Sequence, residues 1–200
     1  MSTADRTDAL LLEFAGVFQR SMEQHGAYSG SDVGRRAMAL KVGLCLIRYD
    51  LLRYIFEFET PNLPQYAKVR AYADAIRVMV EGMDWIEDKA NSELRKICEA
   101  SGLGTGLHAT LAKRCKCVFS LSAISKYRNY RHALSGHYDL DIPVSLQKFC
   151  GIDAKALQED TRGFAEYLNQ WVINLAEVFE SPKSPNNAMH TDESHTESST

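Results

Sequence analysis

The sequence contains no long hydrophobic run, no secretion signal and no glycine-rich phosphate loop. None of its 200 residues falls in a stretch approaching the roughly 18 consecutive apolar residues that a membrane helix needs. The N-terminal residues Met1 to Asp8 are polar and lack a signal-peptide pattern. Neither a G-x-x-x-x-G-K nor a G-x-G-x-x-G motif is present. These absences predict a cytoplasmic protein that has no membrane contact and no nucleotide cofactor.

Cysteine usage also excludes several classes of protein. The five cysteines are an odd number and form no set of evenly placed pairs, so reduced thiols are expected. The close pair Cys115 and Cys117 has only one residue between its members, and no second pair or histidine-rich segment completes four ligands. We therefore expect neither a disulfide framework nor a metal site. Residues 102–106 are glycine-rich but follow a helical pattern, and they are interpreted as a linker.

Helical periodicity is abundant. Apolar residues recur every three or four positions over five segments, which run approximately over residues 5–24, 29–59, 65–100, 108–131 and 154–180. Thr60 to Pro64 predicts a turn, a bend is expected near Gly82, and Asp153 is expected to cap the last helix. No segment shows the alternation of apolar and polar residues that would predict a strand instead. The predicted fold class is therefore all-α, an up-down bundle of four long helices plus a fifth short element.

The domain organisation is simple. With 45% hydrophobic and 24% charged residues, the chain has the composition of a soluble globular protein. Residues 1–180 are predicted to form a single helical domain. Residues 181–200 are rich in Ser, Thr, Asn and acidic residues with almost nothing apolar to bury, which predicts a disordered acidic tail.

Charge is unevenly distributed along the chain. Residues 100–138 contain six lysines and arginines and no acidic residue, although the whole chain has a net charge of −3. Tyr127, Tyr130, His132 and Tyr138 lie among these cations. Cations that follow a phosphate backbone, beside rings on which bases can stack, suit single-stranded RNA. A solvated helix face with half-buried tyrosines is the structural alternative.

Arg131 and His137 stand six residues apart where the fourth helix should end. In an unbroken helix such a pair is rotated by about 240° and does not converge. Gly136 accepts the left-handed conformation that commonly stops a helix, so His137 can lie past the last turn and fold back toward Arg131. The alternative is that the two side chains only stabilise the helix end.

The stretch from Tyr130 to Tyr138 resembles the signature of the HEPN superfamily, an Arg followed by a polar residue and, after a short gap, a His. Here these residues are Arg131, His132 and His137. The resemblance implies an all-α HEPN-like bundle and a metal-independent endoribonuclease, whose active site forms in a homodimer of toxin or antiviral defence systems. It also implies RNA as a partner and an association with an antitoxin or a larger defence complex. Other members of the superfamily are non-catalytic modules.

The side-chain chemistry of the motif fits RNA cleavage. Histidine side chains ordinarily titrate near neutrality, so His137 suits transfer of the ribose 2′-hydroxyl proton, whereas the fixed planar charge of Arg131 suits binding of the phosphate. His132 is the third predicted catalytic residue, as orienter, phosphate contact or second proton carrier. The predicted substrate-binding residues are Lys126, Arg128, Asn129 and Tyr138.

Two other functions remain open from the sequence. One is a non-catalytic helical module whose basic pole binds RNA, a nucleotide or an effector protein. The other is a small-molecule binder, which would require an apolar cavity among Met38, Tyr72, Met79 and Trp171.

Overall fold

The described part of the chain is helical, and no strand occurs in it. The computed structural model describes residues 32–131 and 151–180, together with Gly16, Gln19, Arg20, Glu23, Gln147 and Phe149. Its elements in chain order are α2 Asp32–Glu59, α3 Gln65–Trp85, the π-helix η2 Ile86–Ala90, α4 Asn91–Ala100, α5 Gly104–Val118, α6 Ser122–Ser125, the 3-10 helix η3 Arg128–Tyr130 and α8 Ala154–Glu180. The predicted all-α class is confirmed. Apart from the six isolated residues above, the helix expected over residues 5–24, the segment after Arg131 and the tail at 181–200 lie outside this range.

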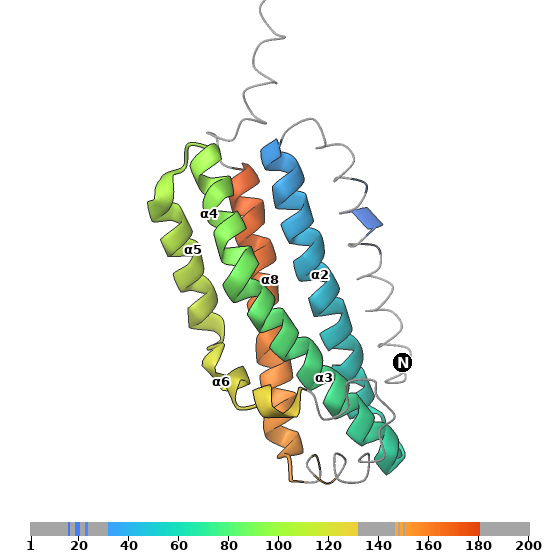
Figure 1. Cartoon of the computed structure of the whole chain (residues 1–200). Coiled ribbons are helices and arrows are strands. Elements are labelled where there is room, and N and C mark those ends of the chain that lie inside the picture. Colours follow the sequence, from blue (N-terminus) through green and yellow to red (C-terminus); the bar gives the residue numbers. More distant parts are fainter. Residues whose placement is uncertain are drawn as a thin grey trace, which may run out of the picture.

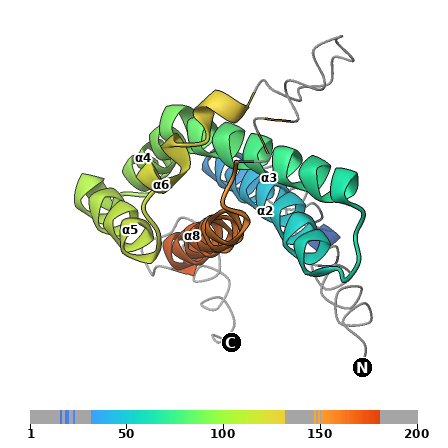
Figure 2. The same ribbon diagram turned by 90° about the horizontal axis from the view of Figure 1, so that it is seen from below.

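The long helices form a bundle in which α8 lies between α2 and α5, and α3 packs on α2 (Figures 1 and 2). The predicted turn between α2 and α3 is confirmed, with Asn62 at a φ of 60°. Asparagine tolerates this left-handed conformation better than most residues. Within the described residues, no helix combines the length and the apolar character needed to cross a bilayer.

α8 is the helix that the sequence predicted best. The side chains of its predicted stripe are all buried, namely Phe164, Leu168, Trp171, Leu175 and Val178. Asp153 caps the helix by accepting hydrogen bonds from the backbone N–H of Lys155 at 3.0 Å and of Ala156 at 3.1 Å. A buried amide also ties α8 to α5, because Asn174 Nδ2 donates to the carbonyl of Leu111 at 3.1 Å.

The third predicted helix is continuous to Ala100, but its irregularity is not at Gly82. The regular helix passes through Gly82, and the π-helical segment η2 follows it. Gly82 has a packing role instead, because a Cβ at this position would lie 2.9 Å from Ile47 and 3.2 Å from Phe164. We expected a bend near Gly82, but the role of this glycine is in packing, because its lack of a side chain allows neighbouring helices to approach closely.

The fourth predicted helix is wrong at both ends. α5 begins at Gly104, so only residues 101–103 separate it from α4, and the predicted linker is partly helical. α5 then ends at Val118 rather than continuing to Arg131, because Phe119 adopts an extended conformation with φ −154° and ψ 143°. A Cβ on Gly163 would come within 2.5 Å of the Phe119 ring. Phe119 therefore packs closely on α8 at Gly163, at the point where α5 ends.

Candidate nucleic-acid interface

Two short helical pieces, α6 and η3, carry the described half of the predicted site. Lys126, Arg128, Asn129 and Arg131 fall on them or directly beside them. They cross the same end of the bundle as the beginning of α8 and lie against α3 (Figure 1). The predicted site residues His132, His137 and Tyr138 lie outside the described residues, so the convergence of Arg131 and His137 stays a prediction.

Tyr127 fixes this segment to α8. Its side chain is buried, and its hydroxyl donates a hydrogen bond of 2.8 Å to Asp160 Oδ2. Burial raises the pKa of Tyr127, and the bond to the Asp160 carboxylate raises it further. Lys126 Nζ lies 2.7 Å from the same carboxylate oxygen. Asp160 therefore holds a neutral phenol and a cation together.

The tyrosines of the segment do not act as exposed stacking platforms in this structure. Tyr127 is 4% exposed and faces the core. Tyr130 is half-buried, with its ring centroid 5.7 Å from that of Phe149. For these two rings the packing interpretation replaces the base-stacking one, and Tyr138 remains untested.

Asp84 of α3 contacts both arginines of the segment. Arg128 Nη2 lies 2.9 Å from Asp84 Oδ1, and Arg131 Nη1 donates to Asp84 Oδ2 at 3.1 Å. Glu87 approaches Arg128 at 3.6 Å, and Glu81 approaches Arg131 at 4.0 Å. The arrangement places two guanidinium groups on the two oxygens of one carboxylate.

Both arginines nevertheless remain open to solvent. The Arg128 side chain is 49% exposed and the Arg131 side chain is 37% exposed. A guanidinium has five N–H donors, and the contacts with Asp84 use only part of them. Surface ion pairs of this kind contribute roughly 0–1 kcal/mol each, so a phosphate can compete for the arginines.

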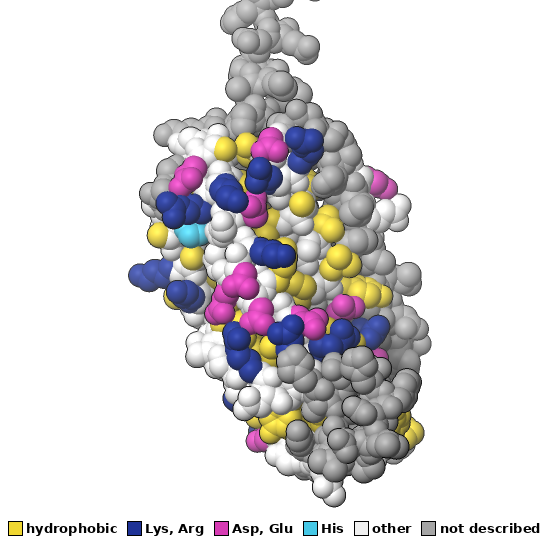
Figure 3. Space-filling model, viewed as in Figure 1, with side chains coloured by type: hydrophobic (Ala, Val, Ile, Leu, Met, Phe, Trp, Pro, Cys, Tyr) yellow, Lys and Arg dark blue, Asp and Glu magenta, His cyan; other side chains and the backbone are white. Residues whose placement is uncertain are grey.

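The acid-free stretch of sequence does not produce an acid-free surface. Lys126, Arg128 and Arg131 pair with carboxylates of α3, η2 and α8, and Arg114 pairs with Glu177. Figure 3 accordingly shows Lys and Arg side chains interspersed with Asp and Glu. The charge asymmetry along the sequence is therefore largely compensated in space.

Sequence reasoning missed the carboxylates of this site. It gave Asp84 and the neighbouring acids Glu81 and Glu87 no role. The signal that was present is the spacing of Glu81, Asp84 and Glu87, three residues apart along one helix. Such spacing places acids near one another on a helix surface, where they can meet a basic segment.

No group of three His, Cys, Asp or Glu side chains suited to a metal ion occurs among the described residues. The two cysteines of the C-x-C pair do not face the same environment, since Cys115 is buried and Cys117 is exposed. Burial raises the pKa of the Cys115 thiol to about 12, and Asn174 Nδ2 lies 3.1 Å from its sulfur. Cys115 is therefore a neutral core side chain.

Comparison of the chain with protein-family models, with curated proteins and with solved structures finds no match.

Proposed function

We propose that this chain is a metal-independent endoribonuclease of a toxin or antiviral defence system, built as a HEPN-like up-down bundle of four long helices and active as a homodimer in the cytoplasm. The observation that carries the proposal is the pair of half-exposed arginines, Arg128 and Arg131, held on Asp84 immediately before the histidines of the motif. Two guanidinium groups at one place on the surface form a natural site for an RNA phosphate.

The reaction follows from the side chains of the motif. His137 takes the proton of a ribose 2′-hydroxyl, and the 2′-oxygen bonds to the adjacent phosphorus. Arg131 binds the phosphate oxygens as negative charge builds on them. The bond from phosphorus to the 5′-oxygen breaks, and that oxygen takes up a proton, for which His132 is the nearest candidate in the motif. The products are a 2′,3′-cyclic phosphate end and a 5′-hydroxyl end, and no metal is needed.

Asp84 has a defined part in this proposal. Each of its oxygens contacts one arginine, which brings the two guanidinium groups together before RNA binds. A preorganised pair of cations avoids the entropy cost of ordering two long side chains when phosphate arrives. Lys126 and Asn129 would extend the contacts along the backbone, together with Tyr138.

Cleavage of single-stranded RNA in excess EDTA tests the proposal. The unmodified protein is expected to leave cyclic phosphate ends, and Arg131→Ala or His137→Ala is expected to abolish cleavage. Arg95→Ala is the matched control, because Arg95 is an exposed arginine whose Nε donates to Glu99 at 2.9 Å on α4. Cleavage that survives both motif substitutions would exclude the assignment.

A non-catalytic helical module that binds RNA, a nucleotide or an effector protein is the second candidate. The observation that favours it is the compensation of Arg128 and Arg131 by Asp84, Glu81 and Glu87, which weakens the field of the site in the unbound protein. Salt-sensitive binding of RNA that stays intact would select this candidate over the nuclease.

A further inference from the structure

One side of α2 is buried although it lies outside the core. Met38 is 4% exposed and Cys45 is 2% exposed, yet neither belongs to the core cluster that the other buried apolar side chains of the described residues form. The two residues are seven positions apart, which places them two turns apart on one side of the helix. Ala37 and Leu44, each one position earlier and about 100° away around the helix, do belong to that cluster. α2 therefore has a second buried side, beside the one that faces the core.

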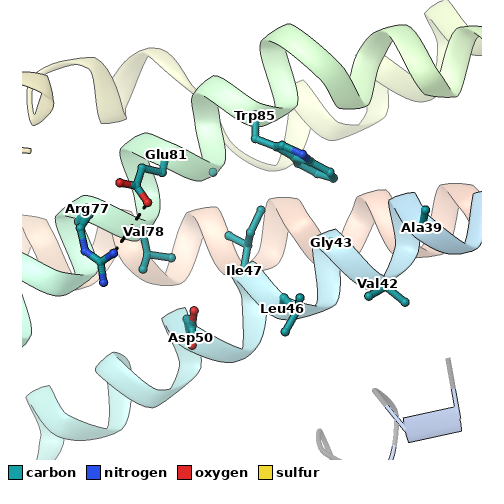
Figure 4. Close-up of a pocket in the computed structure, with 11 residues that line it drawn as sticks. Ala39, Val42, Gly43, Leu46, Ile47, Asp50, Arg77, Val78, Glu81 and Trp85 are labelled. Carbon is teal, nitrogen blue, oxygen red and sulfur yellow. Dashed lines mark ion pairs between the residues drawn. The ribbon is translucent and has the colours of Figure 1, made fainter. Parts of the chain in front are cut away.

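A third side of α2 is open. Figure 4 shows Val42 and Leu46 along α2, at the edge of a groove of about 580 Å³ between α2 and α3. The groove is lined by none of the four residues expected around a small-molecule cavity, namely Met38, Tyr72, Met79 and Trp171. Leu46 is 46% exposed, although it directly follows the buried Cys45. Whatever buries Cys45 is therefore confined to its own side of α2.

The described residues near the N-terminus form one side of a helix. Gly16, Gln19, Arg20 and Glu23 are helical, and the three polar side chains among them are exposed. Gln19 Nε2 donates a hydrogen bond of 3.0 Å to Glu23 Oε1, one turn further on. Spacings of three and four residues place all four on the same side. The piece of this segment drawn in blue lies beside α2 in both views of the bundle (Figures 1 and 2).

The sequence places apolar residues on the opposite side of this segment. Phe14 and Phe18 each stand two positions from Gly16, a rotation of about 200°. Leu11 is seven positions before Phe18 and shares its side. An amphipathic helix owes most of its stability to packing of its apolar side. The apolar side of the segment and the buried side of α2 are therefore suited to each other.

The connection between the two helices favours an antiparallel arrangement. The helix expected over residues 5–24 is joined to Asp32, the first residue of α2, by the seven residues 25–31. Connections of about two to eight residues are usual between helices that pack side by side in a bundle. The segment can therefore return along α2 directly.

The same arrangement sets a register. Met38 lies six residues after Asp32, and Phe18 lies six residues before position 24. Cys45 and Leu11 each lie thirteen residues from these two ends. Because both helices rise equally per residue, antiparallel packing brings Phe18 level with Met38 and Leu11 level with Cys45.

We infer that residues 5–24 form an amphipathic helix that packs antiparallel on the Met38 and Cys45 side of α2, with Phe18 on Met38 and Leu11 on Cys45. The described piece of the segment beside α2, its exposed polar side and the matching register select this segment as the occupant. The helix excludes water from the Cys45 thiol and leaves the neighbouring groove at Leu46 open. The inference does not depend on the proposed nuclease.

Thiol labelling of the full chain, read for each cysteine by mass spectrometry, tests the contact. The exposed Cys117 should react fast and the buried Cys45 slowly. Leu11→Asp with Phe18→Asp is expected to speed the labelling of Cys45 at least about tenfold, because charged side chains do not stay on an apolar surface. Uncovering also removes the burial that raises the pKa of the Cys45 thiol, which increases the reactive thiolate.

Matched controls separate this effect from general unfolding. Gln19→Asp with Arg20→Asp adds the same two aspartates on the exposed side and should leave the labelling unchanged. Cys98 and Cys115 belong to the core cluster and should stay protected in both variants. The inference is overturned by a Cys45 that is labelled as fast as Cys117 in the unmodified chain, by an unchanged rate in the Leu11 and Phe18 variant, or by equal gains at all three buried cysteines. Protection of Cys45 that is lost on dilution would assign the contact to a second copy and overturn it as well.

Cross-linking tests the register in the folded chain. Under mild oxidation Leu11→Cys is expected to form a disulfide with Cys45, because the two positions lie level on facing helices. Leu12→Cys, about 100° further around the helix, is the matched control and should not form it. Equal yields at the two positions, or none at Leu11→Cys, would overturn the register. Because neither experiment involves RNA, failure here leaves the proposed nuclease standing, and a protein that passes both but cleaves nothing refutes only the nuclease.

Discussion

Asp84 and Asp160 hold the same short segment from two sides, and they do so with different partners. Asp160, whose side chain is 15% exposed, accepts a hydrogen bond from the buried Tyr127. Asp84, 26% exposed, contacts Arg128 and Arg131, which remain half open to solvent. The first carboxylate fixes the backbone of the segment to α8, whereas the second sets the positions of charges at the surface. The comparison separates a stabilising contact from a contact that prepares a binding site.

Removal of the buried phenol should have the largest effect on stability. Tyr127→Ala leaves a cavity in the core and removes the hydrogen bond to Asp160, so the free energy of unfolding is expected to fall by about 3–4 kcal/mol. Urea denaturation measures the loss. Tyr66→Ala is the control, because Tyr66 is 65% exposed, and its effect should stay within about 0.5 kcal/mol. Equal losses in the two variants would show that Tyr127 does not anchor the segment.

Alkaline pH should weaken the same anchor. A raised pKa means that the folded protein favours the neutral phenol, so this stabilisation is complete below the ordinary tyrosine pKa of about 10 and is lost as the pH rises through the higher value. One such group changes the free energy of unfolding by at most about 1.4 kcal/mol per pH unit. Tyr127→Phe should lower stability by about 1 kcal/mol at neutral pH and reduce the slope above pH 10.

The slope should not vanish in Tyr127→Phe, because burial also raises the pKa of Tyr167 and of Cys115 to about 12. Tyr66→Phe serves as the control for the loss of an exposed hydroxyl. An unchanged alkaline slope in Tyr127→Phe would contradict a pKa of Tyr127 that is raised by burial and by the Asp160 contact.

Asp84→Asn should have the smallest effect on stability. Its ion pairs are only partly buried and join it to two arginines that are open to solvent, so the free energy of unfolding is expected to change by less than about 1 kcal/mol. RNA cleavage should fall on the order of tenfold, because Arg128 and Arg131 lose their fixed positions. Glu99→Gln removes a more exposed ion pair, with Arg95, and should leave cleavage unchanged. A large loss of stability in Asp84→Asn would show that Asp84 stabilises the fold as Asp160 does. The proposed difference between the two carboxylates would then be wrong.

The sequence predicted the parts of the fold whose signals are local. The bounds of α8 follow from Asp153 and a regular apolar stripe that lie next to each other along the chain. The end of α5 could not be predicted in this way, because Phe119 packs on Gly163 from a distant part of the sequence. The apolar periodicity of the sequence continues past Phe119, and periodicity alone cannot indicate a contact with Gly163.

The candidate site shows the same division. The basic residues and their place near the end of the fourth helical segment were visible in the sequence, but their partners were not, because Arg131 and Asp84 are 47 residues apart. A count of charges along the chain predicts a cationic surface only when opposite charges do not fold against it. Here α3 supplies such charges.

The salt dependence of RNA binding tests most directly whether Arg128 and Arg131 form one phosphate site. In a His137→Ala background, which is expected not to cleave, Arg128→Ala and Arg131→Ala should each reduce the slope of log affinity against log salt concentration by about 0.7 for single-stranded RNA. Arg95→Ala should leave the slope unchanged. Slopes that stay equal in all three variants would contradict the account, because the two arginines would then make no contact with phosphate.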